Sequence, residues 1–336
     1  MLTLGVETSC DETAVALVED GEVLSSEVSS SVHLHSPYGG VVPEIASRFH
    51  VEYIYPVMRK ALEDAGRTVG DVDLVAVTQG PGLPGSLLVG IAFAKAVSFA
   101  DETPVIGVDH LHAHIFSCFQ REGKENVIGS MFPFVGVVIS GGHTSIYLCR
   151  GISDLTVIGS TRDDAVGEAF DKVAKILGLG YPGGPVVEKR AAAHTGKDEI
   201  GFPRTLLGEE DLDFSFSGIK TSVLYYWQRS AKTESDKSSI CFSFQEAVMD
   251  VLVEKITRAV RTTGARRLAV GGGVVNNKSL RERIKRLCDE EEVELFLPDG
   301  DLCTDNAAMV AGLGEVLFAE GARSSDLFLN ARPAGV

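Results

Sequence analysis

Two stretches of the sequence, LTLGVETSCDETAVALVED at residues 2–20 and FVGVVISGGHTSIYLCR at residues 134–150, decide the fold. Each stretch has two apolar, β-rich runs that flank a short turn of small and polar residues. A further strand-like segment follows each of them, SEVSS in the first case and LTVIGSTR in the second. Both stretches therefore predict a three-stranded meander.

The segments that follow the two meanders repeat one order of elements. The first meander is followed by VPEIASRFHVEYIYPVMRKALEDAG (helix), DLVAVTQ (strand), SLLVGIAFAKAVSFA (helix), TPVIGVD (strand) and a helix beginning HLHAH. The second is followed by DDAVGEAFDKVAKILG (helix), RRLAVGGG (strand), NKSLRERIKRLCDEE (helix), VELFLPD (strand) and DNAAMVAGLGEVLFAEG (helix). The order βββαβαβα thus occurs twice, which predicts two similar α/β lobes around a central cleft.

The duplication sets the expected domain boundaries. We expect an N-terminal lobe at 1–122 and a C-terminal lobe at 123–304, which a helical insertion at about 195–239 interrupts. We expect the segment 305–336 to form a C-terminal helix that bridges the lobes. Tandem lobes of this kind resemble the ASKHA superfamily of actin, Hsp70 and the sugar kinases, which implies a nucleotide in the cleft.

Composition restricts the class of protein. The 336 residues, 44% of them hydrophobic, are enough for a large core, and no apolar run approaches the roughly 20 residues of a membrane helix. The six cysteines form no CxxC pair, which suits a reducing cytoplasm and argues against a cysteine zinc site. A formal net charge of −16 repels polyanions, so a nucleic-acid substrate would need a local basic patch or a partner.

Three histidines lie close together in VDHLHAHI, at residues 108–115. His110 and His114 are four residues apart and share one face of a helix, whereas His112 points away. In the second repeat, the helix at the matching place opens with Asp305. If the duplication brings the two helix starts together, two imidazoles and one carboxylate converge, a ligand set that suits zinc or iron(II).

A zinc peptidase is the other reading of these histidines. The peptidase motif HExxH places a glutamate, which serves as general base, directly after the first histidine. That position is Leu111 in this sequence, which argues against peptidase chemistry.

The turns of the two meanders predict a paired phosphate clamp, because small residues let backbone N–H groups approach phosphate oxygens. The residues concerned are Thr8, Ser9 and Glu12 in the first turn, and Ser140, Gly141, Gly142 and His143 in the second. Glu12 would repel a phosphate unless it takes part in proton transfer; the alternative is that it faces solvent.

A third group of residues favours binding of a nucleoside. The turn in VGGGVVNN lets the backbone approach a planar group, with Asn276 or Asn277 supplying paired donor and acceptor contacts. The loop GYPGGP would line the same pocket. Asp171 could accept hydrogen bonds from ribose hydroxyls; the alternative is a solvated carboxylate four residues before Lys175. A basic helix face is either solvated or a candidate for phosphate contact; it contains Lys278, Arg281, Arg283, Lys285 and Arg286.

Ten motifs in order resemble the bacterial TsaD (Gcp, YgjD) family over nearly the whole chain. They are GVETSCDETAVAL, PEIASRFH, TQGPGLPGSLLVG, DHLHAHI, ISGGHTSI, DDAVGEAFDKVAK, YPGGP, DFSFSGIKT, GGGVVNN and CTDNAAM. The resemblance implies transfer of the threonylcarbamoyl group from threonylcarbamoyl-AMP to N6 of the adenosine next to the anticodon of tRNA, which releases AMP. It also implies a metal that orients and polarises the substrate.

The resemblance further implies sites and partners. His110, His114 and Asp305 would hold one divalent ion, iron(II) or zinc, with magnesium as a third option. The substrate would contact Val138, Ile139, Ser140, Gly141, Gly142, Asp171, Gly184, Glu188 and Asn277. Glu12 and Ser9 are the candidate catalytic residues, and no serine or cysteine nucleophile is needed. The implied partners are threonylcarbamoyl-AMP or an adenine nucleotide, tRNA, a TsaB-like paralogue and a TsaE-like ATPase, with no membrane.

Two other functions remain open from the sequence. The first is an ASKHA-type ATPase or phosphotransferase, in which the same turns hold ATP; a histidine metal pair is foreign to that chemistry. The second is a non-catalytic regulatory subunit, against which the presence of His110, His114 and Asp305 argues.

Overall fold

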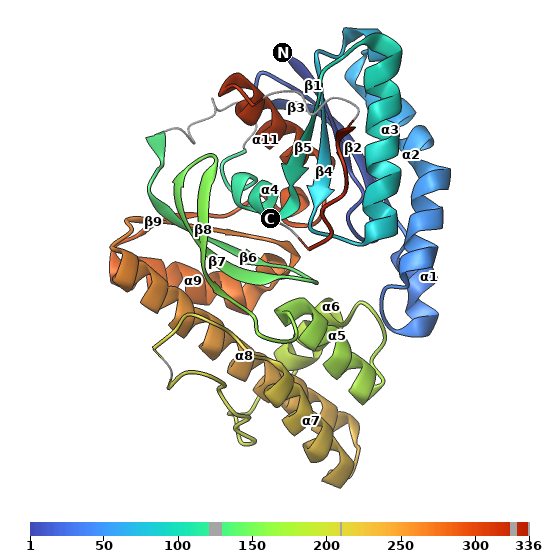
Figure 1. Ribbon diagram of the computed structural model, residues 1–336. Helices are drawn as coiled ribbons and strands as arrows, with labels where there is room; N and C mark the ends of the chain where they lie inside the picture. The colour runs from blue at the N-terminus through green and yellow to red at the C-terminus, as the bar shows by residue number, and fades with distance from the viewer. Residues whose placement is uncertain (121–129, 209, 323–327, 335–336) are drawn as a thin grey trace. The chain divides into compact units, whose positions relative to one another are not determined.

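The two meanders begin two five-stranded sheets of the same topology (Figure 1). The structure is a computed structural model that describes residues 1–120, 130–208, 210–322 and 328–334. The strand order is β3-β2-β1-β4-β5 in one sheet and β8-β7-β6-β9-β10 in the other. In each sheet the first three strands are antiparallel and the last two run parallel to the first. The predicted duplication is confirmed.

The chain divides into two units. The first unit comprises Met1–Ser130 with Pro298–Val336, and the second comprises Met131–Leu297. The first contains β1 (Leu2–Glu7), β2 (Glu12–Glu19), β3 (Glu22–Ser30), α1 (Val32–His35), η1 (Ser36–Tyr38), α2 (Pro43–Ala65), η2 (Val69–Asp71), β4 (Leu74–Gly80), α3 (Pro84–Asp101), β5 (Val105–Asp109), α4 (His110–Phe116), α10 (Gly300–Cys303) and α11 (Ala307–Ala319). The second contains β6 (Phe134–Ile139), β7 (Thr144–Gly151), β8 (Asp154–Ser160), α5 (Val166–Leu177), α6 (Gly183–Ala192), α7 (Ser217–Arg229), α8 (Glu234–Thr263), β9 (Arg267–Gly271), η4 (Gly273–Asn276), α9 (Lys278–Glu291) and β10 (Glu294–Phe296).

Helix ends follow the punctuation in the sequence. Pro43 opens α2, where its missing N–H leaves no hydrogen bond unmade. Gly66 ends α2 with φ 63°, in the left-handed region that a glycine adopts without steric cost. Gly178 ends α5 in the same way, with φ 66°.

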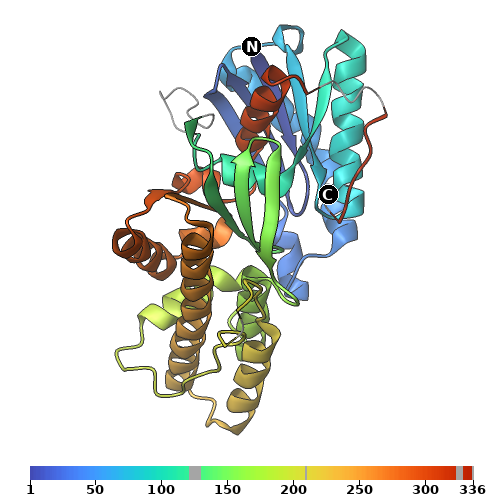
Figure 2. The same ribbon diagram turned by 60° about the vertical axis from the view of Figure 1, so that its left-hand side comes forward.

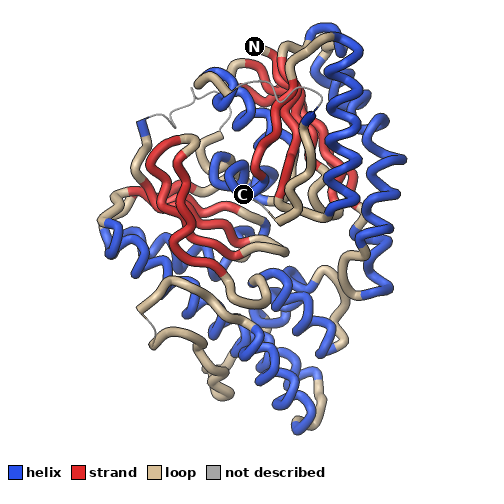
Figure 3. The backbone as a smooth tube through the Cα atoms, in the orientation of Figure 1, coloured by secondary structure: helices blue, strands red, loops and turns tan. Residues whose placement is uncertain are grey.

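Helices cover both faces of the first sheet (Figure 3). In β1, Leu4 and Val6 face a core that includes residues of α2 and α3. The alternation of a strand turns Gly5 to the opposite face, where an added Cβ would lie 2.3 Å from the carbonyl oxygen of Ala307. Helix α11 therefore packs against the backbone of β1, and the face toward α11 also receives Glu7.

The C-terminal segment differs from the expected bridge. We expected 305–336 to span the two lobes, whereas the structure groups it with the first unit. The reason is the small-residue packing of α11, whose contacts include β1, β2 and β4. An added Cβ on Gly314 would lie 2.4 Å from the Cβ of Ala76, so α11 lies close against β4 as well.

The second unit has a larger helical layer, which includes the predicted insertion (Figure 2). Phe170 of α5 contacts Phe244 of α8 with ring centroids 5.0 Å apart. An ion pair holds the segment before α7 to α8, because Arg204 pairs with Asp250 at 2.9 Å. Arg204 also pairs with Asp198 of its own segment at 3.1 Å. The fully buried Lys255 donates to the carbonyl oxygen of Asp211 at 2.7 Å.

Two further expectations concern the whole chain. All six cysteines are free thiols, as their scattered spacing predicts. Among the described residues, α3 is the one helix long and apolar enough to cross a membrane. Ile91, Ala94 and Val97 of α3 are buried in the core of the first unit, as is usual for a helix that packs on a sheet.

Candidate metal centre and substrate-binding residues

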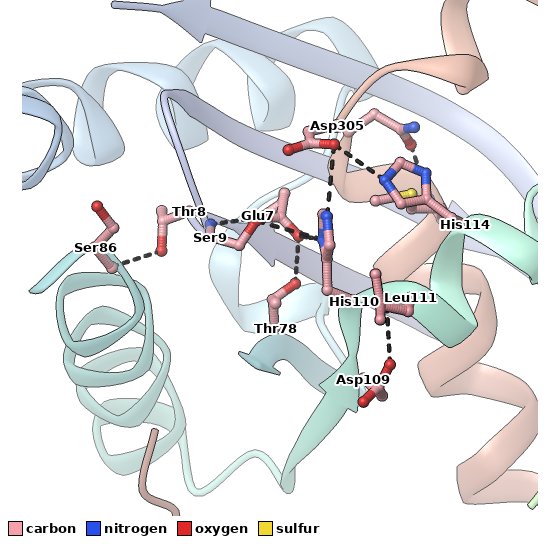
Figure 4. A network of polar contacts seen from close by, with 12 residues as sticks. Glu7, Thr8, Ser9, Thr78, Ser86, Asp109, His110, Leu111, His114 and Asp305 are labelled. Atoms are coloured by element: carbon pink, nitrogen blue, oxygen red, sulfur yellow. Dashed lines mark hydrogen bonds and ion pairs between the residues drawn. The ribbon is translucent and has the colours of Figure 1, made fainter. Parts of the chain in front are cut away.

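His110, His114 and Asp305 converge within the first unit (Figure 4). Their ligand atoms all lie within 4.8 Å of one another. Asp305 Oδ1 is 3.0 Å from His114 Nε2 and 3.6 Å from His110 Nε2. The histidines are 4% and 0% exposed, whereas the Asp305 side chain is 19% exposed, so the cluster is accessible from the carboxylate side.

Local capping sets the positions of these residues. Asp109, the last residue of β5, accepts hydrogen bonds from the backbone N–H groups of Leu111 and His112 and so caps α4. The cap starts the helix at His110, which places His114 one turn later on the same face. Asn306 caps α11 by accepting from the N–H of Met309, so Asp305 directly precedes the helix cap.

The donor set fits a divalent cation. His110 Nδ1 lies 3.0 Å from Glu7 Oε2, which leaves Nε2 to face Asp305. Burial lowers the pKa of His110, but the negative charges of Glu7 and Asp305 outweigh it and raise this pKa to about 9. The cluster therefore favours a positive charge, and two imidazoles with one carboxylate are ligands that zinc and iron(II) accept.

The remaining residues of the histidine run lie outside the cluster. His112 is half-buried and contributes no ligand atom to it. Leu111 is buried beside His110, so the position that a zinc peptidase gives to its general base holds an apolar side chain.

The first meander turn packs against the start of α3. Thr8 Oγ1 donates to the carbonyl oxygen of Ser86 at 2.9 Å, and Ser9 O accepts from the N–H of Leu83 at 2.8 Å. An added Cβ on Gly82 would lie 2.6 Å from Ser9 O, and one on Gly90 would lie 2.3 Å from Thr8 Oγ1. Gly82 and Gly90 of GPGLPGSLLVG are therefore needed for the close approach of helix and turn.

His50 fixes the other side of this turn. It is fully buried, and its Nε2–H donates to the carbonyl oxygen of Cys10 at 3.0 Å. Its Nδ1 lies 2.8 Å from Thr13 Oγ1. Burial lowers the pKa of His50, which favours the neutral ring.

The two candidate catalytic residues lie on this turn. The Ser9 side chain is 2% exposed, and its Oγ is 3.4 Å from His110 Nδ1. Glu12 begins β2 and accepts from Ser30 Oγ at 3.1 Å. Burial and the negative charges of Asp11 and Asp305 raise the pKa of Glu12 well above its usual range. Its carboxyl group therefore holds a proton at a higher pH than an exposed glutamate does.

The predicted phosphate turn in the second unit is open. Val138 and Ile139 are fully buried strand residues, so their backbone alone could contact a ligand. Gly141 and Gly142 are exposed, and an added Cβ on either would meet no heavy atom within 4 Å. Ser140 Oγ accepts from the N–H of His143 at 3.1 Å, which holds the turn in shape.

Asp171 and Gly184 lie near the start of α6. Asp171 Oδ1 accepts from the N–H of Gly183 at 2.7 Å. Gly184 is half-buried, and an added Cβ there would meet no heavy atom within 4 Å. Both positions stay predictions for substrate contact.

Glu188 and Asn277 lie around the start of α9. Glu188 Oε1 accepts from the N–H of Lys278 at 2.8 Å. Asn277 is buried and caps α9, because its Oδ1 accepts from the N–H of Leu280 while its Nδ2 donates to Gln245 Oε1 at 3.0 Å. The paired donor and acceptor that we expected it to offer a nucleoside already have partners in the protein, whereas Asn276 is exposed.

The basic face of α9 is partly neutralised. Arg283 pairs with Asp250 at 2.6 Å and with Glu246 at 2.5 Å. Arg281 donates to the carbonyl oxygen of Val275 at 2.8 Å. Lys278, Lys285 and Arg286 are exposed and remain the candidates for contact with a phosphate backbone.

The sequence did not reveal several residues of the site. Asp109 could have been found, because an aspartate before a helical run is a cap signal. Glu7, Thr78 and His50 gave no such signal, since each acts through contacts with residues more than 30 positions away.

The duplicated sheets and the histidine–carboxylate cluster define the class of protein as a two-unit α/β protein of the ASKHA fold with a candidate metal centre. Two solved structures share the fold. The T. kodakarensis HypF structure covers 98% of this chain and 49% of its own, with a TM-score of 0.61 and 15% identity. A ROK family glucokinase from Streptomyces griseus covers 94% and 99%, with a TM-score of 0.50 and 14% identity.

Sequence relatives identify the family. The TsaD family model, described as tRNA N6-adenosine threonylcarbamoyltransferase, matches residues 22–312. A protein of that name from Syntrophus aciditrophicus is 48% identical over 334 residues, which cover 98% of this chain and 96% of the relative. The chain therefore belongs to the TsaD family of tRNA N6-adenosine threonylcarbamoyltransferases, as its motifs predict.

Proposed function

We propose that the protein transfers the threonylcarbamoyl group of threonylcarbamoyl-AMP to N6 of the adenosine next to the anticodon in tRNA. The observation that carries this proposal is the buried cluster of His110, His114 and Asp305 beside the turn that holds Ser9 and Glu12. A cation bound by the cluster would polarise a carbonyl group of the substrate. The carboxyl group of Glu12 on the turn would take a proton.

The reaction is an acyl transfer from a mixed anhydride. The lone pair of the adenosine N6 attacks the carbamoyl carbon and forms a new C–N bond. The bond between that carbon and the phosphate oxygen then breaks, and AMP leaves with the electron pair. N6 loses one proton, so a base must lie near the attacking nitrogen. No oxidant and no covalent intermediate with the enzyme are required.

His110, His114 and Asp305 would hold one divalent ion, iron(II) or zinc, with magnesium as the third option. Such an ion would supply Lewis-acid polarisation of the carbonyl group of the substrate.

Residues of the first unit act on the acyl group. Glu12, whose pKa is raised by burial and by nearby carboxylates, takes the proton that N6 releases. Ser9 Oγ lies next to His110 and can donate to a substrate oxygen. The reaction needs no thiol nucleophile, and burial and the charge of Asp11 raise the pKa of the Cys10 thiol well above its usual range.

Residues of the second unit hold the AMP moiety. The exposed backbone of Gly141 and Gly142, with Ser140 and the strand end at Val138 and Ile139, offers N–H groups to the phosphate. Asp171 and Glu188 accept from ribose hydroxyls, and Gly184 lets the nucleoside approach the backbone. Asn277 supports the base indirectly, through the start of α9.

Partner proteins and a cellular location belong to the same proposal. A protein with net charge −16 needs help to hold tRNA, which a TsaB-like paralogue would supply. A TsaE-like ATPase would drive turnover, and the whole system would act in the cytoplasm.

A pair of histidine variants tests the proposal. Purified protein with the companion proteins, threonylcarbamoyl-AMP and unmodified tRNA is expected to yield the modified nucleoside, detected by mass after digestion. His110→Ala should abolish product formation, whereas His112→Ala, on the same helix but outside the cluster, should retain it. Equal activity of wild type and His110→Ala would refute the metal role. Nucleotide hydrolysis without modified tRNA would instead favour an ATPase or phosphotransferase.

A further inference from the structure

Glu7 is a fully buried carboxylate directly beside His110 (Figure 4). Its Oε2 accepts from His110 Nδ1–H at 3.0 Å and from Thr78 Oγ1 at 2.5 Å. Its Oε1 accepts from the backbone N–H of Ser9 at 2.5 Å. A buried carboxylate is costly without partners, and here donors from three different segments satisfy it.

The topology of the first sheet explains this position. Glu7 is the last residue of β1, and strand alternation turns it to the face that Gly5 presents to α11. Val6 lies opposite Val77 of the parallel strand β4, so the next residue along β4 is Thr78. Strand β5 lies beside β4 and leads into His110 at the same edge of the sheet.

We propose that Glu7 is a positioning residue of the metal centre: it holds the His110 ring in the orientation and tautomer that the metal requires. This inference rests on the proposed function, because it assumes that His110 binds a metal ion. With the proton held on Nδ1 by the Glu7 carboxylate, the lone pair is on Nε2, the atom 3.6 Å from Asp305 Oδ1. Carboxylates that accept from the second nitrogen of a ligand histidine commonly serve this purpose.

Glu7 also connects the metal centre to the first meander turn. The same carboxylate that holds His110 accepts from the N–H of Ser9, and Ser9 Oγ lies 3.4 Å from His110 Nδ1. Loss of Glu7 is therefore expected to release both the ring and the turn.

Metal titration of the purified full-length protein tests the proposal. Apoprotein is titrated with Zn²⁺ in competition with a chromophoric chelator, and with Co²⁺ to follow its visible absorption. Glu7→Gln keeps the shape of the side chain but removes the charge, and it should weaken metal affinity by about 10- to 100-fold. It should also alter the Co²⁺ spectrum while thermal unfolding of the apoprotein stays cooperative.

A matched variant shows whether the loss of metal affinity is specific to Glu7 or follows the loss of charge at any buried glutamate. Glu315 is a second buried glutamate of the first unit; it accepts from the N–H of Gly21 at 3.0 Å and lies outside the metal cluster. Glu315→Gln should leave metal affinity within about twofold of wild type, because it touches none of the three ligands.

The outcomes are distinct. If Glu7→Gln binds Zn²⁺ as tightly as wild type does, Glu7 does not position the metal ligand. If wild type and His110→Ala bind Zn²⁺ equally poorly, the proposed metal centre itself is absent.

If Glu7→Gln does not fold, ¹⁵N-histidine NMR of the Zn²⁺-loaded wild type decides the question. It should show His110 protonated on Nδ1 and metallated on Nε2. Coordination through Nδ1 would overturn the proposal.

Discussion

The turns between the first two strands of each sheet occupy the same place in the duplicated topology but differ in character. In the first, between Glu7 and Glu12, the residues Thr8, Ser9 and Asp11 are buried. This turn is held by His50, Ser86 and Leu83. The second, between Ile139 and Thr144, presents two exposed glycines with open space above them.

The two turns therefore suit the two different roles that we propose for them. The first turn brings fixed carboxylates next to two buried histidines, an arrangement suited to acid–base and metal chemistry. The second turn offers backbone N–H groups without side chains in the way, an arrangement suited to a phosphate.

The largest loss of transfer activity should follow a substitution of Asp305, the carboxylate of the proposed metal centre. Asp305→Asn keeps the size of the side chain but removes the charge that faces both histidines, and it should lower transfer activity by about 100- to 1,000-fold. Metal content by mass spectrometry should fall with it. Asp301→Asn, at an exposed aspartate in α10, is the control and should match wild type. Full metal occupancy in Asp305→Asn would contradict the assignment.

The close packing of the first turn predicts the next effect. Gly82→Ala places a Cβ 2.6 Å from the carbonyl oxygen of Ser9, so the turn backbone must move. The free energy of unfolding should fall by about 1–3 kcal/mol, measured by urea denaturation. An unchanged midpoint of urea denaturation would mean that the first turn accommodates the methyl group. The two turns would then not differ in how tightly they are packed.

The thiol of Cys10 reports on the electrostatics of the same turn. Burial and the charge of Asp11 raise its pKa well above the usual range, so little thiolate is present at pH 8. Alkylation of Cys10 in the folded protein should be at least about tenfold slower than in urea and should accelerate only as the pH rises further. Peptide mass mapping measures this rate, and rapid labelling of the native protein at pH 8 would contradict the raised pKa of Cys10.

The open turn of the second unit predicts the smallest change. Gly141→Ala adds a methyl group to open space, so stability should stay within about 0.5 kcal/mol of wild type. The methyl group would lie where a phosphate is expected to approach, and AMP affinity by calorimetry should fall by roughly fivefold. Unchanged AMP affinity would place the phosphate elsewhere.

The sequence was sufficient to predict the repeated order of elements, because periodicity and the glycine and proline punctuation are local. It was also sufficient to bring Asp305 to the histidines, because the helix that follows Asp305 occupies the matching place in the second repeat; the structure groups this helix with the first unit. The small residues of the run AAMVAGLG indicate a helix that packs closely against another element of the fold. They do not say that the partners are Gly5 and Ala76 of the first sheet.

Long-range polar contacts could not be predicted from the sequence either, because they also depend on which segments lie side by side. In the sequence, Glu7 looks like a polar residue at the end of a strand. Only the pairing of β1 with β4, and of β4 with β5, places it beside Thr78 and His110. Asn277 reads as a ligand for a nucleoside, yet the start of α9 and Gln245 take up its amide. Both depend on which segments meet in three dimensions.

The most direct test of the central claim follows the acyl carbon itself. Threonylcarbamoyl-AMP labelled with ¹³C at the carbamoyl carbon is supplied to the metal-loaded protein with tRNA and the companion proteins. We predict that the label appears on N6 of the adenosine and that one AMP is released for each nucleoside modified. We also predict that a chelator stops both and that added metal restores both. Label transfer at full rate in the chelated protein, or AMP release without label on tRNA, would contradict the account.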